Sequence, residues 1–203
     1  MMRLASATFL ALFALAVPTH AGETFDVFRS TCVDAHGDLG RAVATADKMG
    51  WKVIPDSMLQ RLRSNFRLAS AQGRMISISH RFKFLLVAHD SPPSGVFVAD
   101  YCLLVSLPPA EADLEKSVAN FAGVDSVFEP ATGLTGYMWR VENGVHVHVA
   151  QMSPDIPALA ASRALNEMAM RRDATQSALI FIVPTKFRLP SGTPPQTDTP
   201  TGQ

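Results

Sequence analysis

Two histidines have the spacing in this chain that is most suggestive of chemistry. His146 and His148 lie two residues apart in the segment GVHVHVAQ, whose alternating valines predict a β-strand. Side chains of a strand alternate between its faces, so both imidazoles should project from one face, within reach of a common metal ion. A metal-dependent or hydrolytic enzyme built around this pair is therefore one interpretation. The others are a catalytic or pH-sensing base, and a polar strand face that happens to carry two histidines.

The hairpin that contains these histidines also brings aromatic side chains near them. Asn143-Gly144 is a strong signal for a two-residue turn, because both residues tolerate the positive φ angles of a type I′ turn. With that turn Trp139 pairs with His148, so Trp139 and Tyr137 lie on the same face as the histidines. We therefore expect a candidate ligand face, suited to a peptide or a sugar, formed by Tyr137, Trp139, His146 and His148. The alternative is that the aromatic side chains pack in the core.

A run of basic residues is the second feature that could serve a function. Six of them occur in a stretch that has no acidic residue after Asp56, whereas eight acidic residues and only two basic ones lie between Asp90 and Glu142. The basic residues are Arg61, Arg63, Arg67, Arg74, Arg81 and Lys83. If Arg61, Arg63 and Arg67 converge, they form an anion patch for a phosphate, a lipid head group or an acidic protein face, as in an inhibitor or partner-capping protein. If the two regions pack together, the charges form only a self-complementary surface.

The usual catalytic motifs are missing from the sequence. It contains no G-x-S-x-G nucleophile elbow, no HExxH, no P-loop and no glycine fingerprint between a strand and a helix. No histidine follows His148, so a third metal ligand would have to be His36, His80, His89 or a carboxylate. We therefore predict no cofactor, and we favour a non-catalytic binding or accessory domain over an enzyme.

The N-terminal residues have the layout of a secretory signal peptide. Arg3 gives a positive start, residues 4–17 are almost all apolar, and Ala21 is a small residue before the expected cleavage point at Gly22. The apolar run is short for a bilayer and no longer one follows, so we predict a periplasmic or secreted protein without a membrane span. Its partner would be a protein or small molecule of that compartment. The whole chain has 18 Lys and Arg and 18 Asp and Glu; losing Arg3 leaves 17 against 18, which provides no general attraction to nucleic acid.

Two cysteines, Cys32 and Cys102, fit an exported protein. An even pair without C-x-x-C spacing predicts a structural disulfide in an oxidising compartment. A cross-link between positions 32 and 102 would stabilise the fold by about 4 kcal/mol in the chain-entropy model. Two free thiols, or a thiol nucleophile with a histidine partner, are the alternatives.

Hydrophobic periodicity and turn residues divide the mature chain into helices and strands. Helices are predicted at 39–49, 57–66, from Pro108-Pro109 to Gly123, and from Ser153 to about Arg171. Strands are predicted at 75–79, 84–88, 96–107, 134–142, 145–152 and 178–183, with a turn at 91–95. Hairpins with few βαβ units indicate a single α+β domain over residues 22–189, with a mostly antiparallel sheet and helices packed on one face. Residues 1–21 are the signal peptide, and the Pro- and Thr-rich residues 190–203 are predicted to be a disordered tail.

Several of these features together resemble small exported proteins of Gram-negative bacteria that have no assigned activity. They are the signal peptide, the early Phe28 to Cys32 spacing, Gly50-Trp51 at a helix exit, and Cys102 on a strand before Pro108-Pro109. The resemblance extends over most of the mature chain in layout and implies no catalytic residues.

Overall fold

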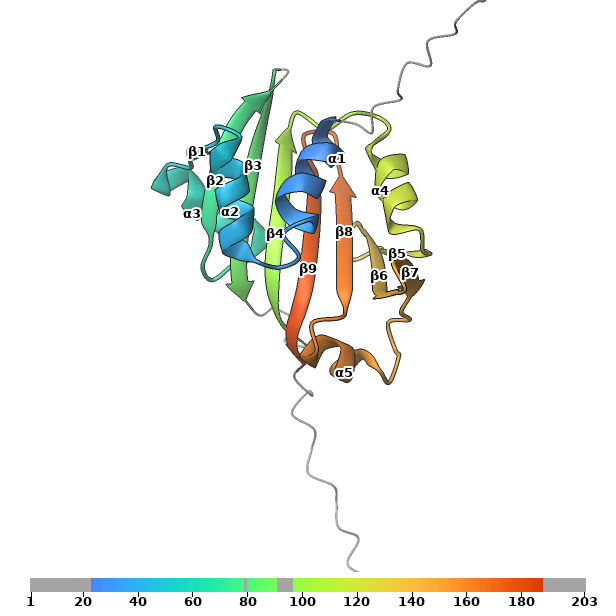
Figure 1. Ribbon diagram of the computed structural model, residues 1–203. Helices are drawn as coiled ribbons and strands as arrows, with labels where there is room; N and C mark the ends of the chain where they lie inside the picture. The colour runs from blue at the N-terminus through green and yellow to red at the C-terminus, as the bar shows by residue number, and fades with distance from the viewer. Residues whose placement is uncertain (1–22, 79, 91–96, 188–203) are drawn as a thin grey trace, which may run out of the picture.

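The structure, a computed structural model, describes residues 23–78, 80–90 and 97–187. These residues form a nine-stranded antiparallel sheet with helices packed against it (Figure 1). The predicted α+β fold is confirmed. The predicted signal peptide, the turn at 91–95 and the tail at 190–203 lie outside the described residues. In the described ranges, no helix has both the length and the apolar character needed to cross a bilayer.

The elements follow one another along the chain in a mixed order. The helices are α1 (Glu23–Phe28), which continues into a π-helical turn η1 (Arg29–Val33), α2 (Leu39–Lys48), α3 (Asp56–Phe66), α4 (Leu114–Ala122) and α5 (Ile156–Ala161). The strands are β1 (Lys52–Val53), β2 (Gln72–Ile78), β3 (Arg81–Asp90), β4 (Phe97–Leu107), β5 (Ser126–Glu129), β6 (Leu134–Glu142), β7 (Val145–His148), β8 (Asn166–Arg172) and β9 (Ser177–Phe187).

The C-terminal strand lies in the middle of the sheet. The strand order is β1-β2-β3-β4-β9-β8-β6-β5, and β7 pairs with β6. β9 therefore joins a half built from β1–β4 to a half built from β5–β8, pairing with β4 on one side and β8 on the other.

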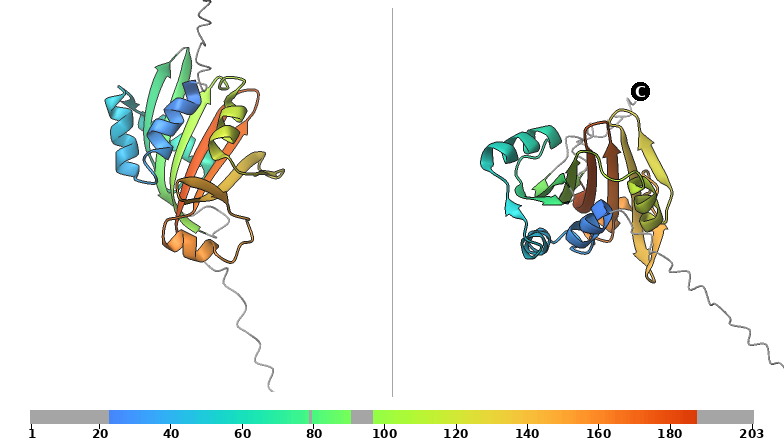
Figure 2. Two further views of the ribbon diagram at one scale, coloured as in Figure 1. Left: turned by 45° about the vertical axis from the view of Figure 1, so that its right-hand side comes forward. Right: turned by 90° about the horizontal axis from the view of Figure 1, so that it is seen from above.

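The two faces of the sheet are covered differently. One side, which we call the helix face, presents Leu85, Cys102 and Phe181 to α1, α2 and α4 in the largest hydrophobic cluster. The opposite side, which we call the groove face, presents Leu86 and Leu103, and α3 packs on it through its apolar stripe. Seen from above, α3 lies on one side of the sheet and α1 and α2 lie on the other (Figure 2). α1, α2 and α4 thus share one face, as predicted, whereas α3 lies on the other.

The start and end of α2 are confirmed. The Asp38 carboxylate accepts a hydrogen bond from the Arg41 backbone N–H at 2.9 Å, which satisfies one of the free donors of the first turn. Gly50 follows the helix at φ 82°, a left-handed conformation that glycine adopts without steric cost.

The predicted disulfide is confirmed. Cys32 and Cys102 are joined with an S–S distance of 2.07 Å, and both are buried. The bond ties the helical segment at the start of the described chain to β4, next to the central strand β9.

The predicted hairpin register is also confirmed. Trp139 pairs with His148 and Glu142 pairs with Val145 around the Asn143-Gly144 turn. Both turn residues have positive φ, 51° and 78°, as a type I′ turn requires.

The helix predicted from Ser153 to Arg171 is wrong. Only Ile156–Ala161 is helical, and Asn166–Arg172 forms β8. Met168 and Met170 alternate with Ala169 and Arg171, so the period is two, and main-chain bonds to β6 and β9 stabilise the strand. The apolar spacing of three between Leu165 and Met168 suggested a helix but spans a loop and a strand.

The fourth helix starts later than predicted. α4 begins at Leu114 instead of Pro109, and ends at Gly123 as predicted, with φ 62°. Residues before it are held to the sheet: Ala110 N donates to Ser177 Oγ at 2.9 Å, and Glu111 pairs with Arg81 at 3.5 Å. These contacts keep the segment out of a helix.

Candidate functional site

The candidate site lies on the groove face of β6, β8 and β9. Paired residues of these strands form three rows across the face: Arg171–Ala178, Gly136–Ala169–Ile180 and Met138–Glu167–Ile182. The middle row has small residues at two of its three positions, Gly136 and Ala169, and Ala169 is buried. Arg171 and Glu167 flank this row on the same strand, about 13 Å apart along it.

A hollow of about 520 Å³ opens beside the first two rows, between the C-terminal end of α3 and the turn that joins β5 to β6. Leu134, Ala178 and Ile180 form an apolar floor, and Phe66 of α3 contributes to the wall. Leu134, Ile180 and Phe66 are only half-buried, so part of their apolar surface meets solvent. The volume is in the range of small-molecule sites. The polar lining residues are Asn65, Arg67, Thr132, Arg171 and Gln176.

Arg67 lines this hollow, which we call the groove, and its backbone has a costly conformation. It ends α3 at φ 55°, in the left-handed region, where α4 has Gly123. A residue with a Cβ costs roughly 1–2 kcal/mol there, compared with glycine. Within the described ranges, no hydrogen bond or ion pair reaches the Arg67 side chain, and that side chain is exposed. Its guanidinium is therefore available to a ligand.

The other groove arginine comes from β8. Arg171 lies 3.2 Å from Asp173 and is about half exposed, so it keeps donors free. None of the described residues that line the groove has a carboxylate, and the two arginines give the lining a positive charge that Asp173 offsets only in part.

Of the predicted patch of Arg61, Arg63 and Arg67, only Arg67 lines this hollow. Arg67 lines the groove, Arg63 donates to the Ala69 carbonyl, and Arg61 lines a separate hollow with Ser57 and others on α3. Arg61 and Arg63 are two residues apart on α3, so they point to different sides of the helix, and Arg67 lies outside the helix in its left-handed C-cap, where the helical spacing no longer applies.

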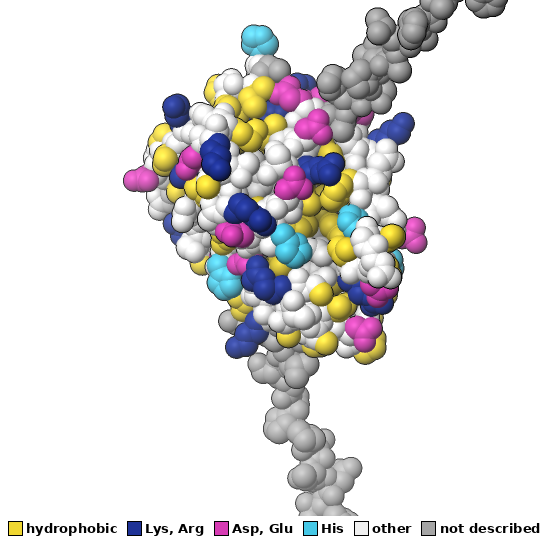
Figure 3. All heavy atoms as spheres, viewed as in Figure 1, with side chains coloured by type: hydrophobic (Ala, Val, Ile, Leu, Met, Phe, Trp, Pro, Cys, Tyr) yellow, Lys and Arg dark blue, Asp and Glu magenta, His cyan; other side chains and the backbone are white. Residues whose placement is uncertain are grey.

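The remaining members of the basic stretch are neutralised within the fold. Arg74 bonds to Asp47 at 2.6 Å, an interaction that lowers the pKa of the Asp47 carboxyl. Lys83 is fully buried, with Nζ 2.8 Å from Thr24 Oγ1, and burial lowers its pKa. On the helix face, basic and acidic side chains are interspersed around apolar ones (Figure 3). The self-complementary interpretation applies to this part of the stretch.

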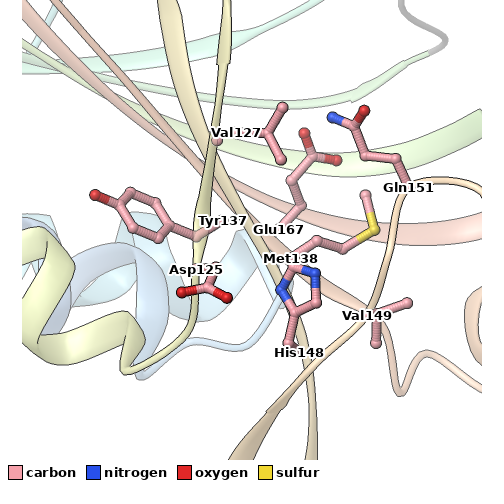
Figure 4. A pocket seen from close by; sticks show the side chains of 9 residues that line it. Asp125, Val127, Tyr137, Met138, His148, Val149, Gln151 and Glu167 are labelled. Atoms are coloured by element: carbon pink, nitrogen blue, oxygen red, sulfur yellow. The ribbon is translucent and has the colours of Figure 1, made fainter.

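A second cavity of about 20 Å³ lies at the other end of the three rows. Figure 4 shows Glu167 pointing toward Val127 and Gln151, while Tyr137 points to the opposite side. Among the described residues, none makes a hydrogen bond or ion pair with the Glu167 carboxyl. Burial, followed by the nearby Glu129 carboxylate, raises the pKa of Glu167 to about 7.

The predicted ligand face is covered by the protein itself. Trp139 is 2% exposed and Tyr137 is buried, both in the core beneath α4. The His146 ring stacks on Trp139 with centroids 4.9 Å apart, and its Nδ1–H donates to the Ala122 carbonyl at 2.9 Å. His148 is exposed and lines the small cavity. This face is therefore not open to a ligand, because α4 occupies it.

The structure does not assemble a metal centre around the histidine pair. In the part of the chain that is described, no group of three or more His, Cys, Asp or Glu side chains is placed to hold a metal ion. His146 and His148 also have different surroundings, one packed and one exposed. The third ligand that the sequence lacks is not supplied by the fold of the described residues.

A constellation that the sequence analysis missed joins β3, β4 and the α5–β8 connection. The buried Asp100 accepts from His89 Nδ1 at 2.6 Å and from Arg163 Nη2 at 2.7 Å. Gly37 lies against Arg163, where a Cβ would come within 2.9 Å of the guanidinium. Because Asp100 already engages the side chains of both His89 and Arg163, we assign it to holding the connection on the sheet.

The groove residues of β8 and β9 were also missed. Arg171 was assigned to the end of a helix, which would have placed it far from Arg67. The alternation of Glu167, Ala169 and Arg171 with Met168 and Met170 was the available signal for their common face.

Comparison of the chain with models of protein families, with curated proteins and with solved structures gave no match. The class of protein is therefore defined by its fold and site: an antiparallel α+β domain with a disulfide and an apolar groove that carries two arginines.

Proposed function

We propose that this chain is exported and acts as a non-catalytic binding domain, in the periplasm or outside the cell, with the groove as its ligand site. The observation that carries the proposal is the hollow of about 520 Å³ beside α3, where the half-buried Leu134 and Ile180 leave part of an apolar floor exposed to solvent. A surface of this kind gains free energy when a ligand removes it from water.

The chemistry of the lining favours binding over catalysis. The polar groups of its described residues are guanidinium, amide and hydroxyl groups, which donate hydrogen bonds, and no nucleophile is paired with a base among them. The disulfide is compatible with an oxidising compartment and supports export.

The binding test uses the neutral fluorescent probe N-phenyl-1-naphthylamine on the mature, disulfide-bonded protein. The variants Ile180→Gln and Leu134→Gln place an amide on the floor at half-buried positions, where the fold should tolerate it. We expect each to weaken probe binding by about tenfold, as loss of apolar contact worth about 1.4 kcal/mol implies. The matched control is Val145→Gln on β7, a 63% exposed position away from the groove. Equal affinity in all four proteins would reject the groove as the site.

The export test is a mass measurement on protein recovered from the periplasm or medium of an exporting host. We expect a chain that starts at Gly22 and is two protons lighter than its reduced form. Retention of residues 1–21 on a cytoplasmic product would contradict export.

A further inference from the structure

The charges along the groove face indicate the chemical class of the ligand, on the condition that the groove is the binding site proposed above. Arg67 and Arg171 stand at one end of the three rows, and Glu167 stands at the other. Between them lie the small residues of the middle row and the apolar Ile180. The face is thus basic at one end, apolar in the middle and carboxylate-bearing at the far end.

We propose that the groove binds a free, single-chain amphiphile with one anionic head group, such as a medium-chain carboxylate. The head group lies at the guanidinium groups of Arg67 and Arg171, and the chain lies inside the hollow, over the half-buried Leu134 and Ile180.

The head-group end is fixed by the arginines. Guanidinium groups bind carboxylates and phosphates through paired, charge-assisted hydrogen bonds. Arg67 has no partner within the described residues, and it keeps its side chain at a position where α4 has glycine. Arg171 shares one Nη with Asp173 and still lines the groove.

The tail end is fixed by the apolar floor of the hollow. Leu134 and Ile180 are half-buried there, so a hydrocarbon chain placed on them removes apolar surface from water. Glu167 lines a separate cavity of about 20 Å³ beyond the buried Ala169, so it does not contact this chain. A charged group at the tail end would lose its hydration on the apolar floor, whereas a terminal methyl group does not.

The test compares ligands of one chain length by displacement of N-phenyl-1-naphthylamine, each below its micelle concentration. We expect decanoate to bind at least about tenfold more tightly than decyltrimethylammonium, since one charge-assisted pair has this magnitude. Decanedioate, whose second carboxylate would lie on the apolar floor, should bind more weakly than decanoate at pH 8. Equal binding of decanoate and the cationic amphiphile would overturn the head-group assignment, and equal binding of the dianion would overturn the placement of the tail on the apolar floor.

Variants separate this inference from the proposed function. Arg67→Gln and Arg171→Gln should each weaken decanoate binding by about tenfold and leave the neutral probe unaffected. Arg61→Gln, on α3 but outside the groove, is the matched control. If the probe binds and neither groove arginine affects decanoate, the ligand class is wrong while the site stands. If the probe does not bind in the groove, the proposed function itself fails.

A bilayer is the competing source of the same head-group chemistry. Cosedimentation with phosphatidylglycerol vesicles distinguishes it from a free amphiphile. Vesicle binding that depends on Arg67 and Arg171, without binding of monomeric decanoate, would assign the arginines to a membrane surface and overturn the proposal.

Discussion

Replacing Glu167 by Gln should stabilise the protein at alkaline pH and leave its stability at acid pH almost unchanged. The carboxyl lies on the groove face, where burial and the Glu129 carboxylate raise its pKa from 4.5 to about 7. Asp125 and His148 line the same small cavity. On β4, the Tyr101 phenol is close enough to interact electrostatically with the Glu167 carboxyl. The amide of Gln has the same shape and never ionises.

The sign of the effect follows from proton binding. An acid with a raised pKa binds its proton more tightly in the folded state, so the free energy of unfolding falls as the pH rises from about 4.5 to about 7. Below that window both states are protonated and the residue contributes no pH dependence. Above it the folded protein carries a desolvated carboxylate, and the full cost of about 3 kcal/mol is present, at 1.36 kcal/mol for each pH unit.

The assay is urea unfolding of the wild type and Glu167→Gln between pH 4.5 and 8, followed by circular dichroism. Other titrating groups are common to both proteins, so the difference between their unfolding free energies isolates Glu167. We expect this difference to be near zero at pH 4.5 and to reach up to about 3 kcal/mol in favour of Gln at pH 8. Glu115→Gln, exposed on α4, is the control for loss of a carboxylate. A difference that does not change with pH would refute the argument that this carboxyl is desolvated.

Three further predictions concern stability. Reducing the disulfide, or replacing Cys32 and Cys102 by Ala, should lower the free energy of unfolding by about 4 kcal/mol, because the bond closes a loop of 70 residues. Urea unfolding midpoints with and without reductant measure this loss, and an unchanged midpoint would contradict it. Asp38→Ala should cost about 1 kcal/mol by removing the cap of α2, measured by thermal melting, with no loss expected for Asp38→Ser. His146→Ala should lower the free energy of unfolding by about 1–2 kcal/mol, because it removes the stacking on Trp139 and the hydrogen bond to the Ala122 carbonyl. His148 is exposed, so His148→Ala should change the stability little. Similar losses in both variants would show that the packing of His146 is unimportant.

Local features of the fold could be predicted where the chemistry of a few neighbouring residues decides the conformation. Asp38, Gly50 and Asn143-Gly144 each have short-range reasons to end or turn a segment, and each lies where it was predicted. The disulfide followed from two cysteines and a predicted signal peptide.

Long-range pairing decided what could not be predicted. Asn166–Arg172 has apolar residues at spacings compatible with either a helix or a strand, and it becomes β8 because β6 and β9 are available on both sides. The groove depends on this assignment, since Arg171 reaches it only from a strand. The burial of Trp139 likewise depends on where α4 packs, which the register of its own hairpin does not determine.

The central position of β9 sets the order in which the molecule can be completed. Until residues 177–187 are present, β4 and β8 each have an unpaired edge, and the two halves of the sheet share no main-chain ladder. Both cysteines precede residue 103, so the covalent link can form while the halves are still apart. Ala178 and Ile180 belong to the same late strand, so the floor of the groove is created by the step that closes the sheet. A chain that lacks this strand would therefore be cross-linked and partly folded, yet without a binding site.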